Sequence, residues 1–288
     1  MATRIAVYIG NELYPGNGSD PAGTIKTLQS SPLTSPILSL LNLSAKDTSQ
    51  LVYNNTPNAV YDTSGNYIGD STWPGILATL RGGNIVEAYL SFSTNGTQFM
   101  GQLIASNPTA AQNILSHIKN TLGFDGIDID DESGDFSAGS PLYALTDAAI
   151  AVGLKLTAAP FFSPSSWGDW IAHVQSKGGT VAWLNLQCYA GGKNNNPGDW
   201  LGMGNPAVPI VAGTCSNCKN PQTTCSTTSV QALYTLWTSG KGSVSSDCWT
   251  GTPNTQPQAI GGGFFWTFGS ISSNFTGYMT AMQTGLNA

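Results

Sequence analysis

Residues 124–132 read Phe-Asp-Gly-Ile-Asp-Ile-Asp-Asp-Glu and contain five of the sixteen acidic residues in the chain. Successive side chains of a β-strand point to opposite faces, so Asp128, Asp130 and Glu132 share one face and the two isoleucines between them share the other. A calcium loop spaces its aspartates similarly, but it uses glycine and asparagine, whereas alternating isoleucines indicate a buried strand. We therefore interpret the acidic face as a catalytic site.

The spacing of these acids favours acid–base chemistry. Carboxylates two positions apart along a strand lie roughly 6–7 Å apart, so each raises the pKa of its neighbour, and burial raises it further. A carboxylic acid that stays protonated at neutral pH can act as a general acid. Glu132 is the last of the row, where a substrate could reach it. We expect no catalytic role for Asp131, which faces the other way, or for Asp135 in the following loop, and a structural role for Asp125.

Short apolar runs alternate with helical patterns along the whole chain, which is typical of parallel strands joined by crossover helices. Helices are predicted after Asn107-Pro108 and Ser140-Pro141, where a capping residue precedes proline, and another around Val230. Eight such units predict an α/β fold, a (β/α)8 TIM barrel forming one domain over residues 1–288, rather than an open doubly wound sheet. The predicted strands are Ile5–Ile9, Pro36–Leu43, Ile85–Phe92, Phe124–Asp130, Leu154–Pro160, Val181–Cys188, Val208–Ala212 and Gly261–Phe268.

Two of the eight units are irregular. The second carries a long insertion with a turn-rich segment at Asp62–Asn66, which suggests a hairpin, and the sixth has no plain helical pattern after Gly191–Pro197. In a barrel of this kind, the chemistry belongs at the C-terminal ends of the strands.

The composition excludes several classes of partner. Only 9% of the 288 residues are charged and the net charge is −6, without a run of lysine or arginine, so nucleic acid and anionic membranes are not expected partners. No apolar run approaches the roughly 20 residues of a membrane span. The sequence shows no signal peptide, but a mature secreted form would look the same.

Cysteine usage points to an extracellular protein. Cys215, Cys218, Cys225 and Cys248 crowd one stretch rich in glycine, serine and threonine, which favours two disulfides of undetermined pairing. Zinc bound through Cys215-x-x-Cys218 is the rival reading, but the chain has only two histidines and no second C-x-x-C pair. The fifth cysteine, Cys188, has apolar flanks and is predicted to be a buried, inert thiol.

The segment Asp125-Gly-Ile-Asp128-Ile-Asp130-Asp131-Glu132 resembles the DGxDxDxE motif of glycoside hydrolase family 18, the chitinases and their relatives. The resemblance runs from about residue 4 to the end of the chain, and it implies a secreted, monomeric hydrolase of chitin or another N-acetylglucosamine-containing glycan that needs no metal or cofactor. Further segments resemble family strands in the same order: Ile5–Asn11, Leu41-Asn42, Leu156–Pro160, Leu186–Tyr189 and Gly261–Trp266.

The resemblance also implies a retaining mechanism in which the substrate itself assists, outside the usual two-carboxylate scheme. Glu132 would protonate the glycosidic oxygen while the 2-acetamido oxygen of the substrate attacks the anomeric carbon. Asp130 would bind the acetamido N–H and share a proton with Asp128, and Tyr189 would donate to the acetamido oxygen. The expected substrate-binding residues are Trp266 under the sugar ring, Gln187, Tyr8, Asn42 and Phe92.

Three departures from the family pattern leave the substrate open. The third strand reads Ser91-Phe92-Ser93-Thr94 where the family has Ser-x-Gly-Gly, and Ala190 replaces the usual Asn or Asp after Tyr189. Asp131 resembles the endo-β-N-acetylglucosaminidase branch, whose members cut the chitobiose core of N-glycans. We therefore expect a chitinase, with the N-glycan-cleaving enzyme and a non-catalytic chitinase-like glycan-binding protein as alternatives.

Overall fold

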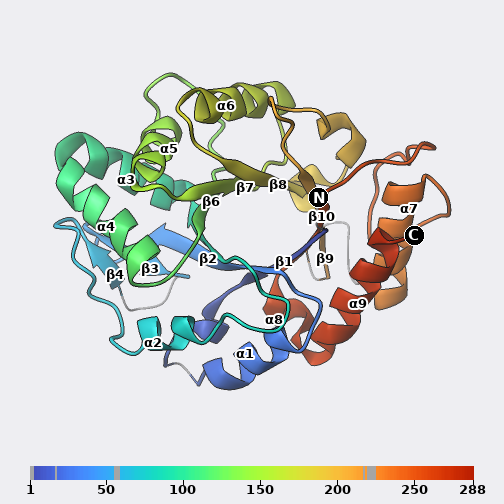
Figure 1. Cartoon of the computed structure of the whole chain (residues 1–288), viewed down its shortest axis with the longest axis horizontal. Coiled ribbons are helices and arrows are strands. Elements are labelled where there is room, and N and C mark those ends of the chain that lie inside the picture. Colours follow the sequence, from blue (N-terminus) through green and yellow to red (C-terminus); the bar gives the residue numbers. More distant parts are fainter. Residues whose placement is uncertain (1–2, 17, 55–58, 217, 219–224) are drawn as a thin grey trace.

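Eight parallel strands close into a barrel (Figure 1). The computed structural model describes residues 3–16, 18–54, 59–216, 218 and 225–288. The first barrel strand pairs in parallel with both the second and the last, which closes the ring. All eight predicted strands are confirmed, as is the TIM barrel. They are β1 (Arg4–Ile9), β2 (Ser35–Leu43), β5 (Tyr89–Ser93), β6 (Gly126–Asp130), β7 (Lys155–Ala158), β8 (Val181–Gln187), β9 (Ile210–Cys215) and β10 (Gly262–Trp266).

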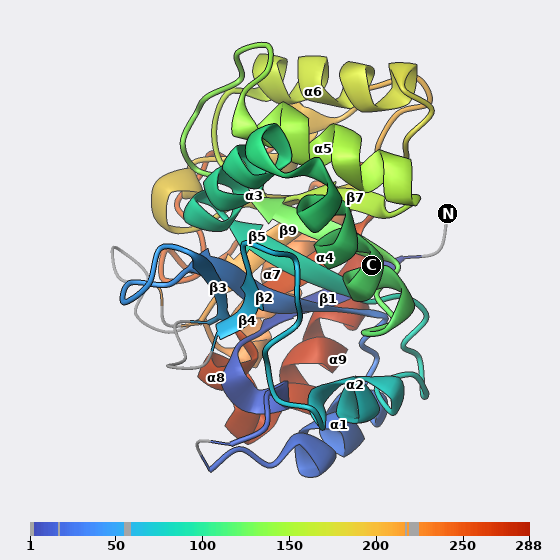
Figure 2. The same cartoon turned by 90° about the vertical axis from the view of Figure 1, so that its left-hand side faces the viewer.

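Helices surround this barrel (Figure 2). The predicted helix starts are confirmed: one helix begins at Pro108, where the Asn107 side chain accepts from the Ala110 N–H, and another begins at Pro141. The helices are α1 (Pro21–Gln29), α2 (Trp73–Ala78), α3 (Thr94–Ser106), α4 (Pro108–Asn120), α5 (Pro141–Val152), α6 (Pro164–Ser176), α7 (Thr227–Ser239), α8 (Phe268–Ile271) and α9 (Phe275–Leu286).

The sixth unit differs from the expected strand-plus-helix pattern. Between β8 and β9, where residues 188–209 are all described, the chain forms only the short 3-10 helices η2 (Ala190–Gly192) and η3 (Pro197–Trp200). Glycine and proline in this segment disfavour an α-helix. A further 3-10 helix, η1 (Asn11–Leu13), follows β1, and another, η4 (Ser272–Asn274), precedes α9.

The insertion of the second unit forms a hairpin. Strands β3 (Gln50–Tyr53) and β4 (Ala59–Asp62) are antiparallel and extend the sheet from β2. The segment Asp62–Asn66 begins at the last residue of β4 and forms a turn, closed by a bridge between Tyr61 and Tyr67. The expectation of a hairpin is therefore confirmed, although its two strands, β3 and β4, come before the predicted turn in the chain.

Strand alternation separates two buried layers. Ile127 and Ile129 belong to the large apolar layer between barrel and helices, as predicted, whereas Asp128 is fully buried on the inner face. A smaller cluster fills the barrel interior and includes Tyr8, Trp183 and other residues whose side chains point inward from the strands. The acidic row therefore points into the barrel.

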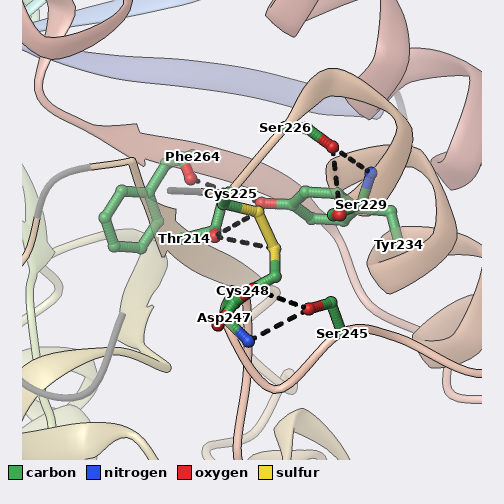
Figure 3. The surroundings of a disulfide bond; sticks show 9 residues. All are labelled: Thr214, Cys225, Ser226, Ser229, Tyr234, Ser245, Asp247, Cys248 and Phe264. Carbon is green, nitrogen blue, oxygen red and sulfur yellow. Dashed lines mark hydrogen bonds between the residues drawn. A yellow bond between two sulfur atoms is a disulfide. The ribbon is translucent and has the colours of Figure 1, made fainter. Parts of the chain in front are cut away.

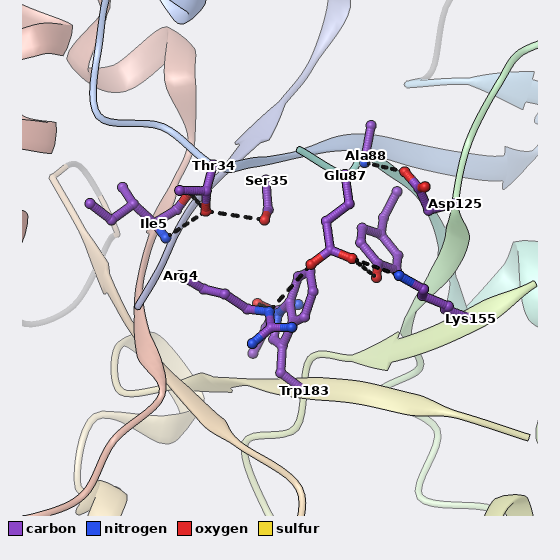
Figure 4. A network of polar contacts seen from close by, with 11 residues as sticks. Arg4, Ile5, Thr34, Ser35, Glu87, Ala88, Asp125, Lys155 and Trp183 are labelled. Atoms are coloured by element: carbon purple, nitrogen blue, oxygen red, sulfur yellow. Dashed lines mark hydrogen bonds and ion pairs between the residues drawn. The ribbon is translucent and has the colours of Figure 1, made fainter. Parts of the chain in front are cut away.

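The N-terminal end of the barrel is closed by a charged network (Figure 4). Glu87 forms ion pairs with Arg4 at 3.4 Å and Lys155 at 3.1 Å, and the Arg4 guanidinium lies 4.6 Å from the centre of the Trp183 ring. Asp125 accepts from the Ala88 N–H at 2.8 Å, which agrees with its expected structural role. A cavity of about 770 Å³ opens at this end. In barrels this face supports stability rather than catalysis.

Two disulfides tie the region after β9, as expected: Cys215–Cys218 and Cys225–Cys248. Cys188 is a buried free thiol, and its burial raises its pKa, which suits the predicted inert role. In the part of the chain that the structure describes, no helix combines the length and hydrophobicity needed to cross a membrane.

Candidate active site

A pocket of about 160 Å³ lies at the C-terminal end of the barrel. Six of its lining residues are ones that the sequence predicted for the site. They come from β1, β6, β8 and β10 and from the segments that follow β6 and β8, so the closed barrel brings together residues from its whole length. The lining residues are Tyr8, Asp130, Glu132, Ala159, Gln187, Tyr189, Ala190, Cys218 and Trp266.

The three acids lie at increasing exposure from the barrel floor to its mouth. Asp128 is fully buried, Asp130 is half-buried at the end of β6, and Glu132 is exposed two residues beyond the strand. Glu132 is thus accessible, and it is the acid that was expected to lie within reach of a substrate. The strand ends before Glu132, so its side chain reaches the mouth, where a bulky substrate can meet it.

Asp128 is held by four donors from four other strands. Tyr8 donates to Oδ2 at 2.9 Å and Ser91 at 2.7 Å. Thr157 donates to Oδ1 at 2.7 Å and Asn185 at 3.0 Å. Burial raises the pKa of Asp128, while these four hydrogen bonds lower it.

Asp130 has a different environment. Desolvation, followed by the charges of Asp128, Glu132 and Asp131, raises the pKa of Asp130 well above its ordinary value. The Gln187 amide nitrogen lies 3.3 Å from Asp130 Oδ1 and 3.4 Å from Glu132 Oε1, and it also donates to the Ala159 carbonyl at 2.9 Å. Gln187 thus links the two acids that line the pocket.

The pocket also presents two phenols and an indole. Burial, and then the nearby carboxylates, raise the pKa of both Tyr8 and Tyr189 well above the ordinary value, so both hydroxyls stay protonated and can donate. Trp266 is half-buried, with its ring centre 5.0 Å from that of Tyr8. The pocket therefore combines acids, hydroxyl donors and one apolar ring face, a set that suits a sugar.

Comparison with known proteins identifies solved structures of the same fold. No protein-family model and no curated protein matches the sequence. Among solved structures, the chain is similar to a GH18 chitinase from Pseudoalteromonas aurantia, with a TM-score of 0.64, 16% identity and coverage of 99% of this chain and 100% of the other. The chain has the fold of the family 18 chitinases.

Two further neighbours share this family 18 fold. A chitinase from Chromobacterium violaceum is 15% identical over 100% of both chains, with a TM-score of 0.58. The catalytic domain of a GH18 chitinase from the fern Peteris ryukyuensis is 18% identical over 99% of both chains, with a TM-score of 0.55. At these identities, the likeness describes the fold.

Two side chains at the end of β5 make different contacts, and one of them supports the acidic segment. The Thr94 hydroxyl accepts from the Glu132 backbone N–H at 2.8 Å. Ser93 caps α3 by accepting from the Gly96 N–H, and its hydroxyl donates to Asn42 Oδ1 at 2.9 Å. Thr94 thereby holds the segment that carries Glu132, whereas Ser93 connects the start of α3 to Asn42.

Two predicted substrate contacts do not line the pocket. Phe92 is fully buried in the layer between barrel and helices, because β5 pairs with β6 in a register that turns Ser91 inward beside Asp128. The prediction that Phe92 contacts substrate is therefore wrong. Asn42 is not among the residues that line the pocket, and its Oδ1 accepts from the Ser93 hydroxyl at 2.9 Å.

The sequence reasoning missed four supporting residues: Ser91, Thr94, Thr157 and Asn185. Thr157 has a recognisable signal, since it lies two positions before pocket-lining Ala159 on the same strand face. The two histidines lie outside the pocket: His117 stacks on Tyr67, and His173 binds Asp147 at 2.7 Å.

Proposed function

We propose that this protein is a retaining glycoside hydrolase that cleaves β-1,4 linkages of N-acetylglucosamine, and that its natural substrate is chitin. The observation that carries the proposal is the row of Asp128, Asp130 and Glu132, which rises from the barrel floor into one small pocket that also contains Tyr189 and Trp266. The family 18 fold agrees with this assignment.

In the proposed reaction, Glu132 gives its proton to the glycosidic oxygen, which makes the aglycon a better leaving group. The 2-acetamido oxygen of the bound sugar attacks the anomeric carbon and forms a cyclic oxazolinium ion. Water then opens this ion with the configuration retained, as Glu132 takes the proton back from water. Exposure at the mouth suits Glu132, since the glycosidic oxygen and then water must both reach it.

Asp130 and Asp128 are proposed to manage the acetamido group. Asp130 accepts from the acetamido N–H and stabilises the positive charge of the oxazolinium. Because its pKa is raised, Asp130 holds a proton that it shares with Asp128. The two carboxyls titrate as a coupled pair. Tyr189, whose hydroxyl stays protonated, donates to the acetamido oxygen and orients it for attack.

A second candidate is cleavage of the chitobiose core of N-glycans. It rests on Asp131, the motif position at which this chain resembles the N-glycan-cleaving branch. The side chain of Asp131 is buried, and its Oδ1 accepts from the Ser133 N–H at 2.8 Å. This contact shapes the turn after Glu132, so Asp131 favours this substrate less strongly than the pocket itself favours chitin.

The setting we infer is extracellular, and we infer a monomer that acts without metal or cofactor. The two disulfides support an oxidising compartment. Chitin oligomers or N-acetylglucosamine-containing glycans are the proposed partners.

The decisive experiment offers chitin oligomers and a high-mannose glycoprotein side by side to the wild type and to Glu132→Gln, with products identified by mass and anomeric form. We expect β-anomeric N-acetylglucosamine oligomers from chitin with the wild type alone. Glycan release would assign the second candidate instead. Binding of either substrate without cleavage would support the glycan-binding alternative, and loss of cleavage with a chelator would contradict the metal-free mechanism.

A further inference from the structure

The two disulfides of this chain meet β9 at the adjacent residues Thr214 and Cys215 but lie on opposite sides of the barrel wall. Thr214 of β9 points outward, where its hydroxyl contacts both sulfurs of Cys225–Cys248 at 3.9 and 3.8 Å (Figure 3). Cys215, the next residue, points to the opposite side, into the barrel, and belongs to the interior cluster. One disulfide therefore joins the segment just before helix α7 to the loop after it, while the other starts inside the barrel.

The inner disulfide reaches the candidate active site. Cys215 is 2% exposed, and it pairs in register with Trp266 of β10. Its partner Cys218 lines the same pocket as Glu132 and Tyr189. The disulfide thus joins a fixed barrel position to the wall of the pocket.

Chain entropy gives this bond a small role in global stability. A disulfide stabilises a protein more when it closes a longer loop. Cys215 and Cys218 are three residues apart, whereas Cys225 and Cys248 are 23 apart. The shorter bond constrains the unfolded chain less, so its main effect is local: it fixes where Cys218 lies relative to β9.

We propose that the Cys215–Cys218 disulfide is a positioning element of the sugar pocket, which holds Cys218 as an apolar wall against the bound N-acetylglucosamine unit. The inference rests on the proposed function. The other apolar surfaces of the pocket come from Ala159, Ala190 and Trp266. A disulfide sulfur is apolar and polarizable, so it can pack against the C–H groups of a sugar or the methyl of its acetamido group.

The test compares two matched double variants, Cys215→Ser with Cys218→Ser and Cys225→Ser with Cys248→Ser. Hydrolysis of N-acetylglucosamine tetramer gives kcat and KM, and thermal unfolding gives Tm. Opening the inner bond should raise KM roughly 5–10-fold with kcat within about twofold, since binding surface is lost but the acids remain. It should change Tm less than opening the outer bond, which should leave KM within about twofold.

A second measurement separates this inference from the proposed function. Tetramer binding to Glu132→Gln, followed through tryptophan fluorescence, requires no turnover. A several-fold higher Kd after opening the inner bond supports the proposed role of Cys218 as a wall of the pocket. Unchanged Kd and KM, or an equal loss of affinity in both double variants, would overturn it. If the wild type cleaves nothing, the proposed function fails, while the Kd comparison still decides the role of the disulfide. If the serine variant does not fold, the alanine pair provides the same comparison.

Discussion

The Tyr8 hydroxyl donates to Oδ2 of Asp128 at 2.9 Å, although the two residues are 120 positions apart in the chain. Three further donors bind the same carboxylate, so Asp128 is a buried acid whose hydrogen bonds oppose the effect of its burial. Each donor therefore tunes the acidic row, and removing one should change how the row titrates.

Replacing Tyr8 by phenylalanine should raise the pKa of Asp128, because the Tyr8 hydrogen bond lowers it. The acidic limb of the kcat/KM profile should then move to higher pH. A matched control is Tyr234→Phe, since Tyr234 is also buried and donates to the Ala212 carbonyl at 2.7 Å, away from the acids. An identical shift in both variants would refute a specific effect on Asp128.

Glu132→Gln should lower kcat by roughly 10²–10⁴-fold, the range that a positioned general acid contributes. Binding of chitin oligomers should persist, because the pocket keeps its shape. Asp135→Asn, in the exposed loop just beyond, is the control and should retain full activity. Steady-state kinetics with oligomers checks both variants, and retained hydrolysis in Glu132→Gln would rule out the assigned acid.

Asp130→Asn should stabilise the protein at neutral pH while abolishing activity. The pKa of Asp130 is raised on folding, so its contribution to stability is fully present below the ordinary carboxyl value of 3.8 and is lost as pH rises through the folded-state pKa. The asparagine amide does not ionise, so the variant does not lose this stability as the pH rises. The expected gain in Tm at pH 7 is roughly 2–4 °C, about 1 kcal/mol for a chain of this size, and it should shrink toward pH 4. A gain that did not depend on pH would contradict the electrostatic cause.

Trp266→Ala should raise KM roughly 30-fold, because an aromatic face against a sugar contributes about 2 kcal/mol of binding. The conservative change Trp266→Phe retains a ring and should recover most of this affinity. Fluorescence or kinetic titration with N-acetylglucosamine oligomers measures the difference. Equal affinity for the wild type and Trp266→Ala would show that the ring packs only against Tyr8.

Tyr189→Phe should lower kcat about 10²-fold, the cost of losing one donor that stabilises the reacting group. KM should change little if the hydroxyl acts mainly in the transition state. Tyr278→Phe is a suitable control, because Tyr278 lies on α9 against Phe265, on the outer side of the barrel. A raised KM with unchanged kcat would assign Tyr189 to substrate binding instead.

Much of the fold and the acidic row could be predicted from local pattern. The eight strands follow from apolar runs, and the shared face of Asp128, Asp130 and Glu132 follows from the two-residue period of a strand. No α-helix forms between β8 and β9, in agreement with the weak helical pattern of the sequence after Gly191. Phe92 was misplaced because its facing depends on the register between β5 and β6, which one strand alone does not show.

The sequence by itself determined the order of strands and helices, the alternation that sets acids against isoleucines, and the residues at the C-terminal ends of the strands. Only the tertiary structure decided which distant side chains meet Asp128, how the cysteines pair and where the acidic row becomes exposed. The physical reason is range: strand and helix periodicity are local properties of the backbone, whereas hydrogen-bond partners and burial depend on how the strands are placed around the closed barrel.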